Sequence, residues 1–184
     1  MVSGLVGLTP IQQSFFESAH IENHSHHNQS VFLISDERIE SAALKSSIES
    51  LIEHHDALRM FYRKGSEGYT QYNDHTVSES YRLEYYDLSE ESSPKEKIGL
   101  IGEELQSGLD IEDGPLFRIA HFRLSTEDRL ALVIHHLVVD GVSWRILLED
   151  LSTLYKAHSK GDSLKLPLKT DSFQYWSSLQ KDYA

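Results

Sequence analysis

Apolar residues recur along this chain with two different spacings, and each spacing predicts a kind of element. Residues 130–134 form an unbroken apolar run, which is typical of a strand that is buried on both faces. Beyond it, apolar side chains return every three or four residues, as on one face of a helix, at Trp144, Leu147, Leu148, Leu151, Leu154 and Tyr155. We therefore expect a buried strand, a tight turn and a helix to follow one another here.

The rest of the chain divides in the same way. Thr9 with Gln12, and Ser93 with Glu96, have the spacing of a capping box, with a proline at the first helical position. Further helices are predicted at residues 9–19, 36–54, 93–109 and 172–179. Strands are predicted at residues 28–35, 81–88, 116–124 and 130–134, with a hairpin within residues 57–72. This order predicts an α/β fold, built as a two-layer sandwich.

Length and composition indicate a single unit. The 184 residues suit one domain, since a chain of about 150 residues already buries about 70% of its unfolded surface. The 29 carboxylates against 17 lysines and arginines argue against nucleic acid as a partner. No apolar run approaches the roughly 20 residues of a membrane span, and no secretory signal is expected from the first residues. Since the chain also lacks cysteine, we expect a cytoplasmic protein without disulfides.

The candidate chemistry lies where the buried strand ends. His135 and His136 follow the apolar run directly, and Asp140 and Gly141 close the turn before the helix. Imidazoles exchange protons near neutral pH, so an acid/base site is the leading hypothesis. Successive strand residues point to opposite faces, so we expect His136 to be exposed and His135 to point inward and hold the turn. Asp140 either orients His136 or anchors the loop through a buried arginine, and Gly141 permits a positive φ.

Other interpretations of these residues are weaker. A structural role for the paired histidines is the alternative to catalysis. A catalytic zinc needs a third protein ligand that nothing near His136 and Asp140 supplies, so no metal is expected. A nucleophilic Ser143 would need a glycine where Arg145 stands, and Ser143 is better interpreted as the helix N-cap. Two further groups are interpreted as structural, namely the histidines at positions 24, 26 and 27 in a polar loop and those at positions 54 and 55 at a helix end.

Four motifs together resemble a known family. Residues 135–141 match the HHxxxDG motif of the condensation-domain superfamily of nonribosomal peptide synthetases, which is similar in fold to chloramphenicol acetyltransferase. Residues 142–151 resemble the version in epimerization domains, whereas condensation domains typically have tryptophan where this chain has Val142. Residues 8–16 resemble the opening motif of epimerization domains, with Ser14 in place of the usual tryptophan. Residues 54–60 and 113–118 match the second and third superfamily motifs.

The resemblance covers the whole chain but only the first half of the family's domain. It implies that residues 1–184 form the N-terminal lobe of an epimerization or condensation-type domain, with the C-terminal lobe absent. It also implies a fold like one lobe of chloramphenicol acetyltransferase. The missing lobe and a peptidyl carrier protein are the implied partners. The family places a glutamate of the missing lobe opposite the second histidine as the other acid/base group.

Resemblance to epimerization domains implies an isomerase. Its substrate is an L-aminoacyl or L-peptidyl thioester on the phosphopantetheine arm of the carrier protein, converted to the D form by proton transfer at the α-carbon. No cofactor is expected to bind this lobe. His136 would carry the proton beside His135, Asp140 and Gly141 would shape the loop, and Arg59 would be the partner of Asp140. The alternatives are a condensation-type acyltransferase lobe that forms an amide bond, and a non-catalytic carrier-docking module. Alone, the lobe is expected to fold but not to catalyse.

Overall fold

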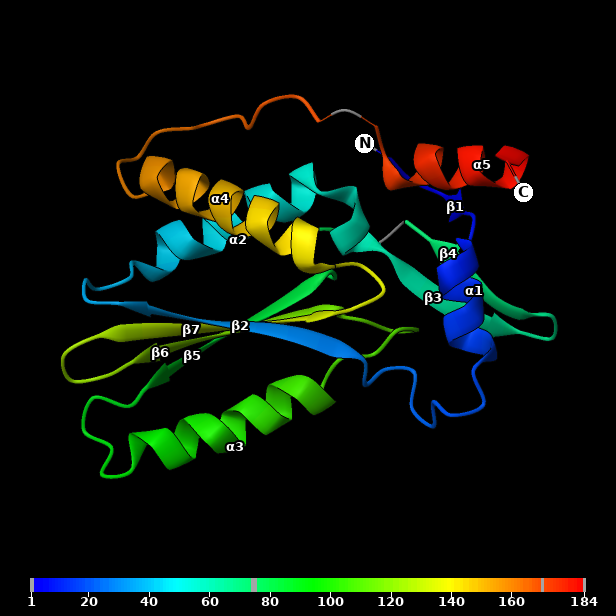
Figure 1. Ribbon diagram of the computed structural model, residues 1–184. Coiled ribbons are helices and arrows are strands. Elements are labelled where there is room, and N and C mark those ends of the chain that lie inside the picture. Colours follow the sequence, from blue (N-terminus) through cyan, green and yellow to red (C-terminus); the bar gives the residue numbers. More distant parts are fainter. Residues whose placement is uncertain (1, 74–75, 170, 184) are drawn as a thin grey trace.

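The computed structural model describes residues 2–73, 76–169 and 171–183, and two sheets organise it (Figure 1). The larger sheet has the strand order β2 (Asn28–Ser35), β7 (Asp128–His135), β6 (Phe117–Arg123) and β5 (Tyr81–Asp87). The smaller sheet has the order β1 (Leu5–Val6), β4 (Gly68–Tyr72) and β3 (Phe61–Gly65). The predicted α/β class is confirmed, and the predicted hairpin is β3 and β4.

The helices lie against both sheets, and those against the larger sheet cover both of its faces (Figure 1). They are α1 (Pro10–Glu17), α2 (Ser41–His54), α3 (Pro94–Ser107), α4 (Gly141–His158) and α5 (Phe173–Tyr183), with a 3₁₀ helix at Asp56–Arg59. Helices α2 and α4 pack together on one face, and α3 packs against β6 and β7 on the other (Figure 1). The predicted sandwich therefore has α3 as an additional layer. None of the described helices is long and apolar enough to cross a membrane.

Strand β7 explains the unbroken apolar run. Leu132 and Ile134 pack in the core cluster that includes α2 and α4, whereas Ala131 and Val133 pack in the cluster beneath α3. Both faces of the strand are therefore buried, and its side chains are apolar at every position from 130 to 134. Complete burial of each large aliphatic side chain stabilises the fold by about 1.5–3 kcal/mol. A charge anywhere in this run would break one of the two cores.

The strands on both sides of β7 determine which segment lies beside His135 and His136. Both neighbours of β7, which are β2 and β6, run antiparallel to it, and among the described strands β5 and β6 are the one parallel pair. The end of β7 therefore lies beside the start of β2, with His135 opposite Asn28. As a result, the loop before β2 reaches the candidate site.

One predicted helix start and one predicted capping box are wrong. Helix α2 begins at Ser41, not at residue 36, because the preceding residues bind the start of β7. Arg38 Nη1 donates to Asp128 at 2.7 Å, and the Ile39 N–H donates to Asp128 at 2.9 Å. At α3, Pro94 is the first helical residue, but the Ser93 side chain makes no capping hydrogen bond. The capping box of α1 is confirmed, with Thr9 and Gln12 bonded reciprocally.

Candidate active site

His135 locks the turn that follows β7. Its side chain is fully buried, and Nε2 donates to the backbone carbonyl of His24 at 2.7 Å. On the other side of the ring, Nδ1 accepts the backbone N–H of Leu137 at 3.2 Å. Burial lowers the pKa of His135 to about 4, so the ring is neutral at pH 7. The prediction that His135 points inward and holds the turn is confirmed.

His136 points the opposite way and is exposed, as predicted. Its Nδ1 lies 2.7 Å from the carbonyl oxygen of Val139, which can only accept, so Nδ1 carries the proton of the neutral ring. The lone pair is then on Nε2. The ring of His27 stacks on the ring of His136, with the centroids 5.1 Å apart and the planes at 19°. The backbone N–H of His136 donates to the backbone carbonyl of His27 at 2.7 Å. These contacts hold an imidazole whose Nε2 can accept a proton.

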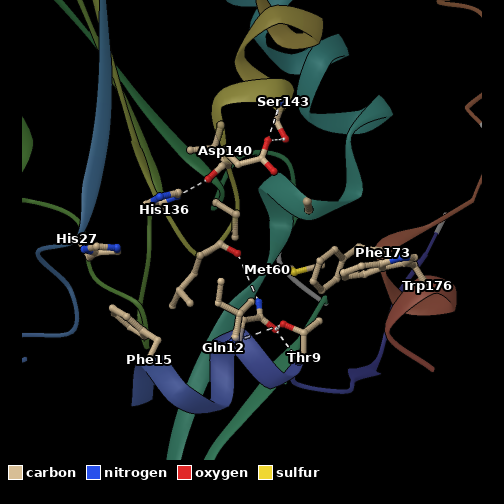
Figure 2. Close-up of a pocket in the computed structure, with 15 residues that line it drawn as sticks. Thr9, Gln12, Phe15, His27, Met60, His136, Asp140, Ser143, Phe173 and Trp176 are labelled. Carbon is tan, nitrogen blue, oxygen red and sulfur yellow. Dashed lines mark hydrogen bonds between the residues drawn. The ribbon is translucent and has the colours of Figure 1, made fainter. Parts of the chain in front are cut away.

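His136 opens onto a cavity of about 440 Å³ (Figure 2). The turn after β7 forms one wall, α1 contributes Gln12 and Phe15 with Thr9 at its cap, and α5 contributes Phe173 and Trp176. Most of the lining is apolar, with a few polar groups at the side of the turn. A pocket of this kind, apolar with a small number of placed polar groups, is typical of ligand and active sites.

Gln12 joins the cavity wall to the smaller sheet. Its amide Nε2 donates to Gln71 Oε1 at 2.8 Å, and it lies 3.3 Å from the Tyr62 hydroxyl and 3.4 Å from the carbonyl of Leu137. The side chains of Gln71 and Tyr62 are fully buried in the smaller sheet. Helix α1 is therefore tied both to the smaller sheet and to the turn that carries His136. The sequence indicated Gln12 only as a capping residue.

Asp140 does not have the predicted arginine partner. Its Oδ1 accepts the backbone N–H and the hydroxyl of Ser143, both at 2.7 Å, so Asp140 is the N-cap of α4 and Ser143 is not. These hydrogen bonds lower the pKa of Asp140. Among the described residues, none of the ion pairs joins Asp140 to Arg59, which is buried and donates to the carbonyls of Ile52 and Glu53. Arg59 thus satisfies carbonyls in the last turn of α2, which have no partner within the helix.

Gly141 permits a positive φ, but the turn does not use this freedom. It is the first residue of α4, and it is not among the glycines with positive φ. A Cβ atom added at Gly141 would meet nothing within 4 Å. Asp140 ends the turn by capping α4, so the backbone enters the helix without a residue in the left-handed conformation.

Two histidines that were interpreted as structural belong to the site. His24 supplies the carbonyl that binds His135, and His27 stacks on His136 and lines the cavity. Partial burial and the neighbouring His136 lower the pKa of His27. The antiparallel register was the signal that could have revealed them, because it places the residues before Asn28 beside the end of β7.

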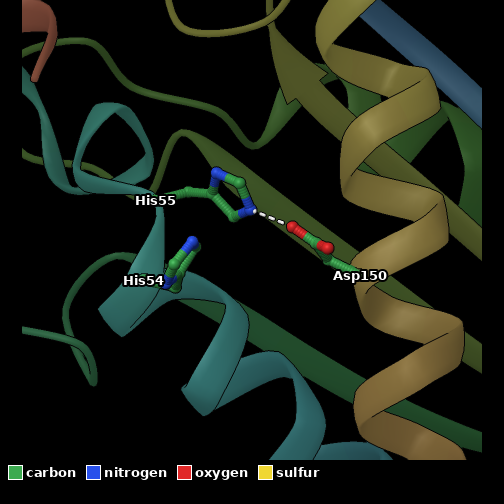
Figure 3. A group of neighbouring side chains, drawn as sticks. All are labelled: His54, His55 and Asp150. Carbon is green, nitrogen blue, oxygen red and sulfur yellow. Dashed lines mark hydrogen bonds and ion pairs between the residues drawn. The ribbon is translucent and has the colours of Figure 1, made fainter. Parts of the chain in front are cut away.

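A second histidine cluster lies at the C-terminal end of α2. His54, His55 and Asp150 place their ligand atoms within 4.8 Å of one another (Figure 3). His55 Nε2 donates to Asp150 Oδ2 at 2.8 Å, which joins the end of α2 to α4. Burial lowers the pKa of His55, with smaller lowering effects from His54 and Lys169, and these outweigh the raising effect of Asp150. Since a lysine already places positive charge beside these groups, we interpret the cluster as a contact between two helices.

The comparisons with known proteins agree with this geometry. The condensation domain family matches residues 2–184. The chain belongs to the condensation domain family. Surfactin synthase subunit 1 of Bacillus subtilis (strain 168) is 42% identical over 184 residues, which cover 100% of the chain and 5% of that protein. Tyrocidine synthase 1 of Brevibacillus parabrevis is 40% identical over 184 residues, which cover 100% of the chain and 17% of that protein.

The fold of the chain also matches solved structures of condensation and epimerization domains. The epimerization domain from the third module of tyrocidine synthetase B superposes with a TM-score of 0.95 at 38% identity, covering 100% of the chain and 40% of that structure. The starter condensation domain of rhizomide synthetase RzmA superposes with a TM-score of 0.83 at 17% identity, covering 98% of the chain and 44% of that structure. The predicted resemblance to the N-terminal lobe of epimerization domains is confirmed, and the chain spans less than half of either domain.

Proposed function

We propose that this condensation-family lobe is part of an epimerase. It would act on an L-aminoacyl or L-peptidyl thioester that is presented on the phosphopantetheine arm of a carrier protein, and it would convert the α-carbon to the D configuration. This reaction requires a base that removes the α-proton and an acid that returns a proton to the opposite face. His136 is the proposed base on the face that this lobe supplies.

The observation that carries the proposal is the state of His136 at the cavity. Its Nδ1 proton is held by the Val139 carbonyl, so Nε2 carries the lone pair of the neutral ring, and the His136 side chain lines an apolar pocket. A positioned acid/base group contributes about 10² to 10⁴ in rate. The 38% identity to the tyrocidine synthetase B epimerization domain, against 17% to the rhizomide starter condensation domain, supports epimerization over amide formation.

We further propose that a second lobe completes the site, with a peptidyl carrier protein as the partner that delivers the substrate. This lobe offers its candidate proton carrier from one wall of an open cavity. Inversion needs an acid on the opposite face, and a water-filled cleft weakens the electrostatic contribution of the groups in it. The 184 residues alone are therefore expected to fold without catalysing epimerization.

Chiral analysis of the carrier-bound product tests this function. The test uses the two-lobed protein that would contain this chain, called here the full-length protein. Loaded with an L-aminoacyl or L-peptidyl carrier, it should accumulate the D form, and His136→Ala should abolish this accumulation. His26→Ala is the matched control, because it removes an exposed histidine of the loop before β2 that does not line the cavity. An amide product without any D form would instead support a condensation-type acyltransferase. Carrier binding without either product would support a docking module.

A further inference from the structure

Gln29 connects the candidate base to the first turn of α4. Residue 29 lies on β2, paired with Ile134 on β7, one position before the histidines. The Gln29 amide oxygen accepts the indole N–H of Trp144 at 2.9 Å. The Gln29 amide nitrogen lies 3.2 Å from Nε2 of His136. The chain thus brings together three side chains from β2, α4 and the turn that joins β7 to α4.

The chemistry of Trp144 fixes the direction of the second contact. An indole N–H can only donate, so the oxygen of the Gln29 amide must face Trp144 and its NH₂ group must face His136. An amide NH₂ group can only donate, so Nε2 of His136 must accept. The Val139 carbonyl, on the opposite side of the ring, independently requires the proton on Nδ1. Both sides of the imidazole therefore select the same tautomer.

We propose that Gln29 and Trp144 are positioning residues for His136: Trp144 fixes the orientation of the Gln29 amide, and Gln29 holds Nε2 of His136 as the unprotonated nitrogen. Nε2 has a single lone pair, so the Gln29 amide must release it when Nε2 takes the α-proton, and this role in catalysis rests on the proposed epimerase function. The tautomer itself does not, because it follows from the hydrogen bonds of the chain. Residues 29 and 144 are thus assigned to the reaction although neither lines the cavity.

The amide group is essential to this arrangement. If the Gln29 amide were free to rotate, its oxygen could face His136 and accept a hydrogen bond from a protonated Nε2. A carboxylate at position 29 would accept from both Trp144 and His136, so it would favour a protonated Nε2. The other titratable groups around the ring are His27, stacked on it from the loop before β2, His135 at the end of β7, and Asp140 at the cap of α4. Only residue 29 hydrogen-bonds Nε2 among the described residues.

Gln29→Glu is therefore the diagnostic variant, since it keeps the size of the side chain and the bond from Trp144 but reverses the polarity toward His136. Trp144→Phe is the second variant, because it removes only the group that orients the amide. Gln13→Glu, at an exposed position of α1, is the matched control for added negative charge. Backbone amide spectra establish that each variant is folded before its histidines are compared.

Nitrogen-15 NMR of the histidine rings in the 184-residue chain reads the tautomer directly, and His136→Gln assigns the signals. At pH 8 we expect the unprotonated nitrogen of His136 to be Nε2 in the unmodified chain and in Gln13→Glu. In Gln29→Glu, Nε2 should be protonated in most molecules, and Trp144→Phe should give a mixture. An unmodified chain with the proton on Nε2, or a folded Gln29→Glu variant with an unchanged His136 spectrum, would overturn the proposal. This outcome is independent of whether the protein is an epimerase.

A kinetic arm in the full-length protein connects the tautomer to the reaction. Trp144→Phe should lower kcat by about ten-fold or more while KM stays within about two-fold, because residue 144 lies outside the cavity and only the orientation of the base changes. Gln13→Glu should leave both constants unchanged. If KM rises and kcat does not fall, the positioning role is wrong even though epimerization occurs. If no variant and no unmodified protein epimerizes, the proposed function fails and the NMR result still decides the tautomer.

Discussion

The Asp140 carboxylate accepts both the backbone N–H and the hydroxyl of Ser143 at 2.7 Å, and these two bonds cap α4. The aspartate of the HHxxxDG motif therefore acts at the helix N-terminus, where a negative charge also interacts favourably with the helix dipole. The cap fixes where α4 begins relative to Val139, whose carbonyl holds the ring of His136. One turn therefore both caps α4 and orients the candidate base.

Removing this cap should destabilise the protein. We expect Asp140→Ala to lower the free energy of unfolding by about 1 kcal/mol, the usual cost of losing an N-cap. Asp140→Ser should retain most of the stability of the unmodified chain, because serine is also a good N-cap. Urea unfolding monitored by circular dichroism measures the difference. If Asp140→Ala and Asp140→Ser were equally unstable, the capping role would be wrong.

The same cap should depend on pH. Because the Ser143 hydrogen bonds hold the pKa of Asp140 below its ordinary value, the carboxylate stabilises the folded state above the pKa of the unfolded chain. That contribution is lost as the pH falls through the lower pKa of the folded state. Asp140→Asn does not titrate, so its stability difference from the unmodified chain should be present at pH 6 and shrink toward pH 3. A constant difference across this range would contradict the assignment.

His135 should make the fold less stable in mild acid. Its pKa falls from 6.5 in the unfolded chain to about 4 in the buried site, so the unfolded state binds the proton first. Stability is complete above pH 6.5 and should decline as the pH falls toward 4, by about 1 kcal/mol per pH unit over most of this interval. The pKa values of His27 and His55 are also lowered, so they contribute in the same direction. His135→Gln therefore isolates one residue, and its unfolding free energy should depend less steeply on pH between 5 and 7.

The Gln12 network should be sensitive to truncation. Gln12→Ala leaves the fully buried polar groups of Gln71 and Tyr62 without this partner, which should cost about 1–3 kcal/mol. Gln13→Ala, one residue further along α1 and exposed, should change stability by less than about 0.5 kcal/mol. Thermal unfolding of both variants provides the comparison. Equal midpoints would show that the network contributes nothing.

Asp128 should be a sensitive carboxylate away from the cavity. Burial alone would raise the pKa of Asp128, but hydrogen bonds from the Ile39 N–H, His121 and Arg38 hold it below the ordinary value. Asp128→Ala removes these bonds to a charged group and should cost at least about 1.5–3 kcal/mol. The exposed pair of Arg63 and Asp113 is the control, and Asp113→Asn should cost less than about 1 kcal/mol. Chemical denaturation distinguishes the two.

Local signals in the sequence predicted much of the framework. Residues 28–35 were predicted as a strand, which matches β2, and the unbroken apolar run located β7. The opposite directions of His135 and His136 followed from the alternation of side chains along a strand. These predictions succeeded because each depends on neighbours within a few positions of the chain.

Some failures depend on the exact path of a local turn, and others depend on contacts between distant segments. Choosing Asp140 over Ser143 as the N-cap requires the path of the turn, and the partners of Arg59 depend on how the 3₁₀ helix folds back on α2. Gln29 meets His136 across 107 positions and Trp144 across 115, through strand pairing that no local pattern specifies. The sequence therefore located the candidate base, but it could not predict the groups that orient it.

The central claim is that His136 removes the α-proton of a carrier-bound substrate, and solvent isotope exchange tests it most directly. The full-length protein is loaded with an L-aminoacyl or L-peptidyl carrier in D₂O, and the α-position of the released product is analysed by mass spectrometry. We predict that deuterium enters the α-position with the unmodified protein and with His26→Ala, and that His136→Ala reduces the rate by at least about 10². Deuterium incorporation that persists at the unmodified rate in His136→Ala would contradict the account.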